Sequence, residues 1–181
     1  MDSWSRIARR IRVPLGFAFA VLYLWLARPV WYSLVIGGSI SIAGLALRAL
    51  ASGHVRKNTE LTTTGPYACT RNPLYLGSMI VAAGFAVAAL NVWIVLALIA
   101  LFAVIYIPVI RSEEIFLRSR FGEFDEYARR VPRFGIRLSN SGSAGGQFSR
   151  ALYLQHREYN AFIGTVLMMG ALLAKLLWLK P

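Results

Sequence analysis

Two short polar stretches of this chain carry side chains that could take part in chemistry. The first is YACTRNPLYLG, residues 67–77, which places a cation, an amide and two phenol rings directly before an apolar run. Asn72 is a favoured N-cap residue and Pro73 is favoured at the first helical position, so a helix should begin here. Free amides at a helix start, with Arg71 beside them, suit an anionic ligand group. Arginine and tyrosine also anchor proteins at membrane interfaces, so this stretch alone leaves both interpretations open.

The second stretch is SEE, residues 112–114, which follows another apolar run. Carboxylates at a membrane cost free energy when they are even partly desolvated, unless a cation pairs with them. Neighbouring helical residues point about 100° apart, so Glu113 and Glu114 are expected to have different roles. One would face a ligand while the other pairs with an arginine, as Glu114 could with Arg118 or Arg111. A solvated charge pair that only ends the apolar run is the alternative.

Metal and disulfide chemistry find little support in the sequence. His54 and His156 are the only two histidines, and neither has neighbours at the spacing of metal ligands. No metal site is predicted. The single Cys69 excludes an intramolecular disulfide framework.

The composition indicates which class of protein must position these stretches. Of the 181 residues 57% are hydrophobic, yet the formal net charge is +12. This mixture is unusual for a soluble domain and typical of a membrane protein with basic loops. A nucleic-acid-binding protein would gather its basic residues on one polar face or arm. We therefore expect contacts with membrane lipids, no nucleic-acid partner and no obligatory protein partner.

Five apolar segments divide the chain, and a membrane helix needs about 20 such residues. They cover residues 13–27, 30–50, 74–90, 92–110 and 161–179. The basic prefix of the first resembles a signal peptide, but Trp25 disfavours cleavage after Ala27, so we expect an uncleaved helix. Only Asn91 separates the third and fourth segments, which predicts a tight helical hairpin that brings the acidic pair close to Arg71 and Asn72. The predicted fold is an all-α integral membrane bundle of about five transmembrane helices.

Basic residues predict the orientation of this bundle. Seventeen of the twenty lysines and arginines fall in the N-terminal arm, in residues 48–71 or in residues 111–157. With five spans these segments share one side, and the positive-inside rule makes that side cytoplasmic. The N-terminus and both polar stretches are thus expected to be cytoplasmic.

The remaining patterns describe a single membrane domain over residues 1–181. Its predicted parts are two helices in 1–50, a core with a cytoplasmic cap in 51–137, a linker in 138–147, and an interfacial segment with the last helix in 148–181. Charged and aromatic residues alternate in 111–134, which predicts short amphipathic helices at the interface, broken at Gly122. Small residues recur every fourth position at Gly37 and Ser41, and again at Ser78, Ala82 and Ala86, as in close helix packing. Pro108 should kink the fourth helix or free a carbonyl.

The two polar stretches together resemble one known family. TGPYACTRNPLYLG, followed after one hairpin by EEIFLRSRFGEFDEYARRVPRF, is similar to the isoprenylcysteine carboxyl methyltransferase and phospholipid methyltransferase superfamily of integral membrane enzymes. The resemblance covers about residues 48–134. It implies S-adenosylmethionine as the methyl donor, bound at the cytoplasmic ends of the third and fourth helices. It also implies a lipid-like acceptor that enters from the bilayer.

The resemblance also implies roles for individual residues. The cofactor-binding set would be Gly65, Pro66, Tyr67, Arg71, Asn72, Pro73, Tyr75, Leu76, Gly77, Glu113 and Glu114. Many family members carry histidine where Asn72 stands, and asparagine cannot act as a general base.

The acceptor decides which further groups are needed. A carboxylate acceptor is already ionised at neutral pH and needs a cation to hold it, for which Arg133 and Arg111 are candidates. An amine acceptor would need a base, which Glu114 could be if burial raises its pKa. Glu114, Arg133 and Arg111 are therefore the predicted catalytic residues. Methylation of a carboxylate is the leading expectation, and phospholipid N-methylation, an NADPH-dependent membrane reductase related to sterol reductases, and a non-enzymatic scaffold are the alternatives.

Overall fold

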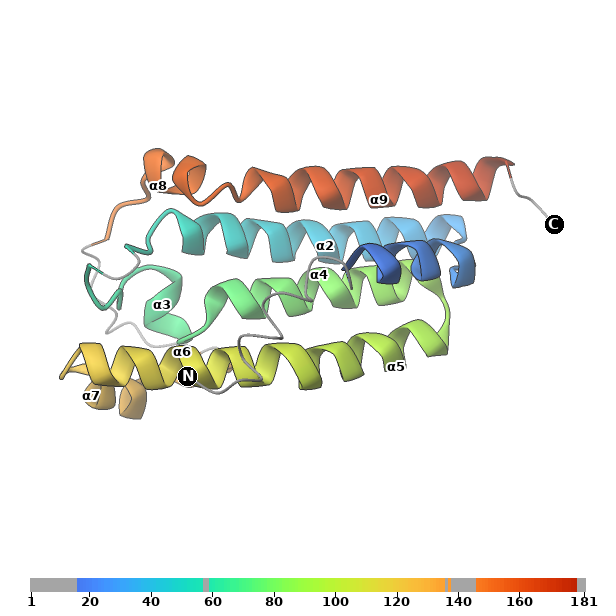
Figure 1. Cartoon of the computed structure of the whole chain (residues 1–181). Coiled ribbons are helices and arrows are strands. Elements are labelled where there is room, and N and C mark those ends of the chain that lie inside the picture. Colours follow the sequence, from blue (N-terminus) through green and yellow to red (C-terminus); the bar gives the residue numbers. More distant parts are fainter. Residues whose placement is uncertain (1–15, 57–58, 136, 138–145, 179–181) are drawn as a thin grey trace.

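The computed structural model describes residues 16–56, 59–135, 137 and 146–178, and all regular elements in this part of the chain are helices (Figure 1). The all-α prediction is confirmed. After an apolar helix Gly16–Leu26 come α2 (Trp31–Ser52), α3 (Pro66–Cys69), α4 (Pro73–Ala89), α5 (Val92–Leu101), the π-helical turn η1 (Phe102–Tyr106), α6 (Ile107–Arg120), α7 (Phe124–Arg130), α8 (Arg150–Gln155) and α9 (Tyr159–Trp178). Most of the predicted linker 138–147, and the ends of the first and last predicted spans, lie outside the described residues.

Long apolar helices lie side by side and form the bundle (Figure 1). Three of them are long and apolar enough to cross a membrane: Trp31–Ser52, Val92–Arg120 and Tyr159–Trp178. The helices Gly16–Leu26 and Pro73–Ala89 are apolar but shorter. All five predicted apolar helices are therefore found, while membrane crossing by the two shorter ones stays a prediction.

Helices α2 and α4 approach each other closely through glycines. A Cβ atom on Gly44 would lie only 2.7 Å from the carbonyl oxygen of Gly77, and one on Gly37 would lie 2.8 Å from the Cβ of Ala88. Small residues at this spacing let two backbones come together. The predicted packing role of Gly37 is confirmed.

The other predicted stripe of small residues, on α4, lies elsewhere. Ala82 and Ala86 line a cavity between α4 and α5 that has no lining residue from α2. Ser78 and Ala82 line a second cavity, which α2 borders through Leu45 and Arg48. The face of α4 in contact with α2 is instead the one that carries Gly77 and Gly84.

The predicted hairpin between α4 and α5 is confirmed. Leu90 ends α4 in the left-handed conformation, with φ of 47°. Asn91 then caps α5, because its side-chain oxygen accepts a hydrogen bond from the backbone N–H of Trp93 at 2.9 Å. Its amide also donates to the carbonyl of Leu26 at 2.9 Å, which ties the hairpin to the first helix.

Helices α5, η1 and α6 form one continuous rod of 29 residues, Val92–Arg120. The prediction of separate short helices in 111–134 is wrong for residues 111–120, which continue this rod. The physical reason is that good helix formers fill residues 111–120 and the first breaker is Gly122, so the helix continues until Phe121 leaves helical geometry. The break at Gly122 and the short helix α7 after it are confirmed. At 1.5 Å per residue the rod is about 43 Å long, whereas the hydrocarbon core is about 30 Å thick. Its last turns, from Arg111 onward, therefore lie beyond the apolar span.

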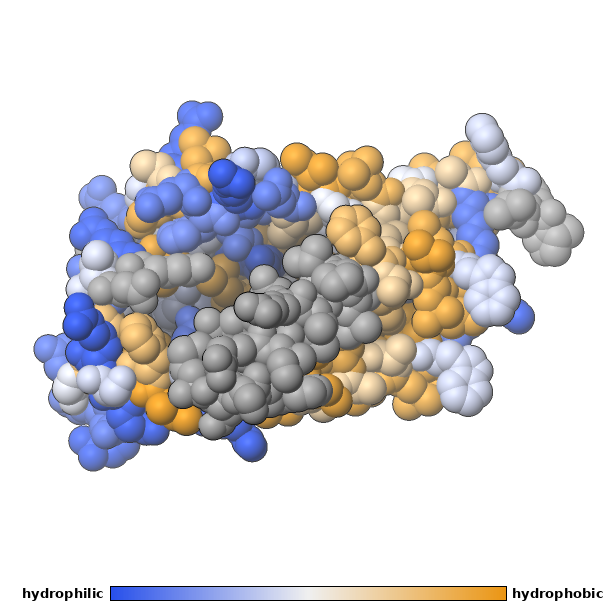
Figure 2. Space-filling model, in the orientation of Figure 1, coloured by the Kyte–Doolittle hydropathy of each residue, from blue (hydrophilic) through white to orange (hydrophobic). Residues whose placement is uncertain are grey.

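The two ends of the bundle differ in chemistry. Hydrophilic side chains gather at the end with α3, α7 and α8, while apolar side chains cover the helices on the face shown in Figure 2. The opposite end carries the exposed indoles of Trp25, Trp31, Trp93 and Trp178. Tryptophan is enriched where a membrane meets water, so these rings mark the second interface.

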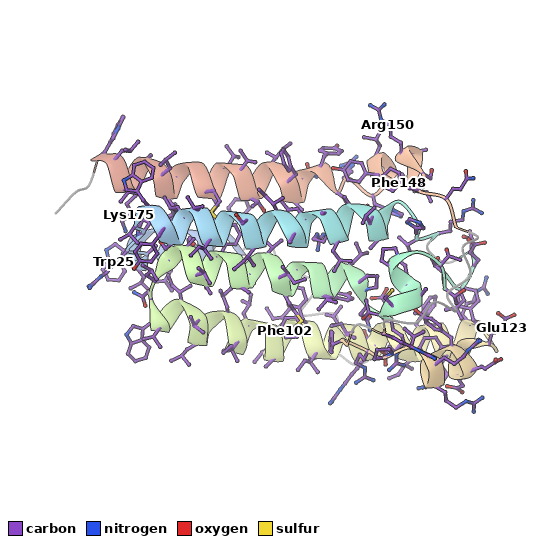
Figure 3. The ribbon with its side chains drawn as sticks, turned by 180° about the vertical axis from the view of Figure 1, so that it is seen from behind. Trp25, Phe102, Glu123, Phe148, Arg150 and Lys175 are labelled. Carbon is purple, nitrogen blue, oxygen red and sulfur yellow. The ribbon has the colours of Figure 1, made fainter. Side chains whose placement is uncertain are left out.

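A lysine joins the first and last helices at this tryptophan-rich end. Figure 3 shows Lys175 beside Trp25, far from Glu123 at the polar end. The ammonium of Lys175 donates to the carbonyl oxygens of Leu24 at 2.6 Å, Trp25 at 3.1 Å and Ala27 at 2.8 Å. Because these carbonyls end the helix Gly16–Leu26, the cation satisfies acceptors that the helix itself leaves open.

Candidate active site

The two polar stretches meet at the polar end of the bundle, as predicted. The segment before α4 lies against the segment after α7: Arg71 N–H donates to the carbonyl of Pro132 at 2.9 Å, and Arg137 N–H donates to that of Cys69 at 2.9 Å. The hydroxyl of Tyr127 donates to the carbonyl of Tyr67 at 2.8 Å. These backbone pairings fix the start of α4 relative to α6 and α7.

Glu114 is the centre of the polar network between these segments. Its side chain is 6% exposed, and both its oxygens accept hydrogen bonds from Arg133, the shortest at 2.5 Å from Nη2. The amide of Asn72 donates to it at 3.2 Å, and Nη1 of Arg71 lies 3.8 Å away. The carboxylate therefore holds two cations and an amide in one arrangement.

Neither arginine that the sequence suggested as a partner of Glu114 fills that role. Arg118 pairs instead with Asp125, at 2.7 Å, and its guanidinium lies over the ring of Phe124. Arg111 is exposed. The actual partners come from other elements, because α6 turns the Glu114 face toward α4 and the segment after α7.

Asn72 begins α4 as predicted, but its side chain does not cap the helix. Its amide donates instead to Glu114 and, at 3.4 Å, to the carbonyl of Arg133. The start of the helix is thus confirmed, and the side chain belongs to the polar network.

The electrostatics of Glu114 do not meet the condition for a general base. Burial alone would raise its pKa, but the hydrogen bond from Arg133, the charges of Arg71 and Arg133 and the amide of Asn72 lower the pKa below its ordinary value. The hydrogen bond to Glu114 in turn raises the pKa of Arg133. Glu114 is therefore an ionised organiser of the site and not a group that takes a proton at neutral pH.

This lowered pKa predicts how stability depends on pH. A carboxyl group with a lowered pKa in the folded state stabilises the fold above its unfolded pKa of about 4.3, and this stabilisation is lost as pH falls through the folded pKa. We expect Glu114→Gln to lower stability by on the order of 2 kcal/mol at pH 7. The difference from the unmodified protein should shrink below about pH 4.

Thermal unfolding of detergent-purified protein at pH 7, 5 and 3.5 measures this dependence. The matched control is Glu126→Gln, which removes an exposed carboxylate paired with Arg130 at i+4. It should change stability little at each pH, because exposed ion pairs contribute little. A constant difference between Glu114→Gln and the unmodified protein at the three pH values would contradict the prediction.

A cavity of about 130 Å³ lies directly beside this network. Of the predicted cofactor-binding residues, the following line it: Tyr67, Arg71, Asn72, Pro73, Tyr75, Glu113 and Glu114. The Nε atom of Arg71 is buried and has no hydrogen-bond partner. A buried donor without a partner is costly, so it marks a place where a ligand acceptor would be stabilised.

The second acidic residue has different surroundings, as the helix geometry predicts. Glu113 is exposed at the cavity and accepts a hydrogen bond from the hydroxyl of Tyr75 at 2.9 Å. It has no arginine within ion-pair distance among the described residues. Its carboxylate is therefore available to a cationic ligand group.

Four predicted cofactor-binding residues do not line this cavity. Gly65 precedes α3 with φ of +57°, and a Cβ there would lie 2.5 Å from the ring of His54. Gly77 contacts α2, where a Cβ would lie 2.6 Å from Cγ of Arg48. Pro66 occupies the first turn of α3, and Leu76 lies on α4, partly buried. The structure thus gives the two glycines packing roles, one on a histidine and one on a helix.

The structure adds three aromatic residues that the sequence did not assign to the site, the exposed Phe116 of α6 and two from α7. Phe124 and Tyr127 of α7 line the cavity, and with Val131 they form a small buried cluster. The sequence showed them only as apolar positions of an amphipathic helix. Their spacing gave no indication that α7 would fold back over the start of α4.

Two larger cavities lie along the apolar part of the bundle. One of about 390 Å³ lies between α2, α4, η1 and α9, and one of about 670 Å³ lies between α4 and α5. Phe102 lines both, and its ring stacks on Tyr106 at 5.3 Å between centroids. Tyr106 in turn meets Tyr75 edge to face at 5.9 Å. An aromatic wall of η1 and α4 therefore separates the polar cavity from the apolar ones.

Comparison with known proteins places the polar stretches within one family. Residues 12–124 match the family described as Phospholipid methyltransferase, which is more than half of the chain. The chain belongs to the phospholipid methyltransferase family. The match covers the start of α4, the long rod and the acidic pair. Membership, together with the long apolar helices, indicates an integral membrane protein.

Two bacterial relatives of this phospholipid methyltransferase family member are similar over part of their length. The nickel-cobalt-cadmium resistance protein NccN of Alcaligenes xylosoxydans xylosoxydans is 45% identical over 84 residues, 46% of this chain and 39% of its own. The cobalt-zinc-cadmium resistance protein CzcN of Cupriavidus metallidurans is 42% identical over 106 residues, 58% of this chain and 48% of its own. The chain thus spans less than half the length of these relatives. No solved structure matches it.

The names of both relatives refer to resistance to metals. Within the described ranges, no group of three or more histidines, cysteines, aspartates or glutamates lies close enough to hold a metal ion. His54 and His156 each donate a hydrogen bond from Nδ1 to a backbone carbonyl, of Leu50 at 2.7 Å and of Ser52 at 3.1 Å respectively. Both histidines thus hold loops in place at the polar end.

Proposed function

We propose that this protein transfers a methyl group from S-adenosylmethionine to a lipophilic carboxylate. The observation that carries the proposal is the buried, unpartnered Nε of Arg71, a residue that lines a cavity built from both family-like stretches. The cofactor carries a carboxylate, an ammonium and an aromatic base. The cavity offers each of these a suitable partner in Arg71, the exposed Glu113 and the rings of Tyr67 and Tyr127.

The volume of the cavity sets a condition on this fit. Pockets for small molecules usually measure about 300–1,000 Å³, so the cavity of about 130 Å³ must widen around a nucleoside-sized ligand. Arg56 and Phe116 line it and are exposed, so their side chains can move without opening the core. The buried network of Glu114 would stay in place.

Each part of the site has a distinct task in such a reaction. When bound, S-adenosylmethionine supplies a methyl group on a sulfonium, and a carboxylate oxygen takes it as the carbon–sulfur bond breaks, without proton transfer. Glu114 positions Arg71 and Arg133, Arg71 binds the carboxylate of the cofactor, and the aromatic wall excludes water from the reacting groups. No residue has to act as a base.

The acceptor is proposed to be lipid-like and to come from the bilayer. The cavity between α4 and α5 supports this, because all the residues that line it are apolar. Phospholipid N-methylation is the second candidate, and the family description favours it. An amine acceptor needs a base, however, and the lowered pKa of Glu114 does not suit that role.

The proposed site lies on the cytoplasmic side of the membrane. Support comes from the basic residues, most of which fall in segments at the polar end. The metal-resistance names belong to the two relatives and contribute nothing to this proposal. Two alternative functions remain to be tested against this proposal: a reductase that uses NADPH, and a non-enzymatic scaffold.

Calorimetric titration of detergent-purified protein tests the donor. We expect S-adenosylmethionine and S-adenosylhomocysteine to bind and NADPH not to bind. Protein in lipid bilayers is then supplied with S-adenosylmethionine that is labelled on its methyl group. We expect the label to be transferred to a carboxylate and recovered as a base-labile ester. Label in a base-stable amine would favour phospholipid N-methylation, and binding of NADPH alone would overturn the proposal.

A further inference from the structure

Arg48 is an ionisable residue inside an otherwise apolar helix. It lies on α2, one turn before that helix ends, and its guanidinium lines the cavity of about 390 Å³ between α2, α4, η1 and α9. Apart from Arg48, Ser78, Tyr106 and Thr165, the residues that line this cavity are apolar or glycine. Charged groups inside a membrane bundle are costly, and they usually mark a site that binds something.

The guanidinium of Arg48 already has the environment of a carboxylate-binding site. Its Nη1 donates to the carbonyl of Leu74 at 3.2 Å and to the hydroxyl of Ser78, which fixes the plane of the group. Its Nε and Nη2 donate to the two oxygens of Glu158, at 3.1 Å, 3.0 Å and 2.7 Å. This paired geometry is the one by which arginine recognises carboxylates.

Glu158 comes from a strained turn and not from the bundle itself. It lies between α8 and α9, directly after Arg157, whose φ is +53°. A residue other than glycine rarely adopts this conformation, and it persists only where the surroundings enforce it. The backbone N–H of Glu158 makes only a long contact of 3.5 Å with the carbonyl of Tyr153. The carboxylate on Arg48 therefore comes from a turn with one strained backbone residue, Arg157.

The Arg48 site lies next to the proposed cofactor cavity. Leu74 lines the cofactor cavity with its side chain, while its carbonyl accepts the hydrogen bond from Arg48. Tyr106 lines the Arg48 cavity and contacts Tyr75, which lines the cofactor cavity. Leu74 and the pair of Tyr75 and Tyr106 therefore connect the linings of the two cavities.

We propose that Arg48 binds the carboxylate head of the lipophilic acceptor and that Glu158 occupies this place until the acceptor displaces it. The inference rests on the proposed methyl transfer and names its substrate class: an amphiphile with a carboxylate head and an apolar chain. The apolar walls of α2, α4 and α9 take the chain, and Ser78 with Arg48 takes the head. Arg133 offers no comparable site, because its partner Glu114 is buried and also holds Asn72 and Arg71, and Arg111 is exposed.

Binding of oleate to the full chain in detergent tests the inference directly, with methyl oleate as the neutral probe. We expect Arg48→Gln to weaken oleate binding about tenfold or more, as loss of a charge-assisted pair should. The same substitution should leave the affinity for methyl oleate unchanged. Arg150→Gln, which removes an exposed arginine of α8, is the matched control. It should change neither the affinity for oleate nor that for methyl oleate. Equal oleate binding by the two variants would overturn the inference.

Glu158→Gln separates displacement from a purely structural ion pair, and it does so even if the Arg48 variant fails to fold. A carboxylate that competes with the ligand should, once neutralised, leave oleate binding tighter by about threefold or more, because binding no longer includes breaking that pair. Lower thermal stability with unchanged or weaker oleate binding would identify a structural pair and overturn the inference. Tighter binding of oleyl phosphate than of oleate would overturn the assignment of a carboxylate head.

The same titrations distinguish this inference from the proposed function. Oleate binding that depends on Arg48, together with no binding of S-adenosylmethionine, would sustain the lipid site and contradict methyl transfer. Binding of S-adenosylmethionine and transfer of its methyl group to an amine lipid, unaffected by Arg48→Gln, would sustain methyl transfer and contradict the lipid-carboxylate site.

Discussion

Replacing Arg71 with alanine is expected to weaken binding of S-adenosylmethionine by about tenfold to a hundredfold, the range of a lost charge-assisted hydrogen bond. The reason is that Arg71 lines the cofactor cavity and carries a buried donor without a partner. Folding should change much less, because Glu114 keeps its hydrogen bonds to Arg133 and Asn72. Calorimetric titration and thermal unfolding of the same preparation measure the two effects.

Arg120→Ala is the matched control for this prediction. Arg120 is an exposed arginine at the end of α6 and does not line the cofactor cavity. Its removal should leave cofactor affinity within about twofold. A variant at Arg71 that loses thermal stability but binds the cofactor as tightly as the control would show that Arg71 is structural.

A methyl group added at Gly37 is expected to destabilise the bundle by about 3 kcal/mol or more, at the upper end of the cost of overpacking. The new Cβ would collide with the carbonyl oxygen of Gly84 and lie 2.8 Å from both N and Cβ of Ala88. Because most of these atoms belong to the backbone of α4, no side-chain rotation can relieve the contact. Thermal unfolding in detergent should show a large decrease in the midpoint for Gly37→Ala.

The adjacent residue provides a control that differs only in the direction of its side chain. A Cβ at Gly38 would meet nothing within 4 Å. Gly38→Ala should therefore leave stability unchanged or raise it by up to about 1 kcal/mol, the difference in helix propensity. Equal effects at the two positions would mean that close packing of α2 on α4 does not hold the bundle together.

The helices were predictable from the sequence because local chemistry decides where they begin and end. Asn72 with Pro73 predicted the start of α4, and Asn91 predicted the tight turn before α5. Both are local features of a few residues. The same reasoning failed at residue 111, where the change from apolar to charged residues suggested a boundary. Charge alone does not end a helix when the residues are good helix formers.

The contacts within the site were less predictable because they depend on how distant segments fold together. The two polar stretches were expected to meet, and they do. The partner of Glu114 nevertheless turned out to be Arg133, nineteen residues away in sequence, and not an arginine of the same helix. The pairing of Arg48 with Glu158 spans 110 residues. Such pairs follow from the packing of α7 and α9, which no local pattern encodes.

The π-helical turn η1 sets the phase between the two halves of the long rod. A π turn contains one residue more than the α-helical path it replaces. If the same residues formed an ordinary α-helix instead, every side chain from Ile107 onward would be rotated by about 100° around the helix axis. Glu114 would then face away from Asn72 while α5 kept its place against α4. Deleting one residue of Phe102–Tyr106 removes the extra residue itself. We therefore expect η1 to become ordinary α-helix without rotation of the residues that follow, so that Glu114 still faces the site.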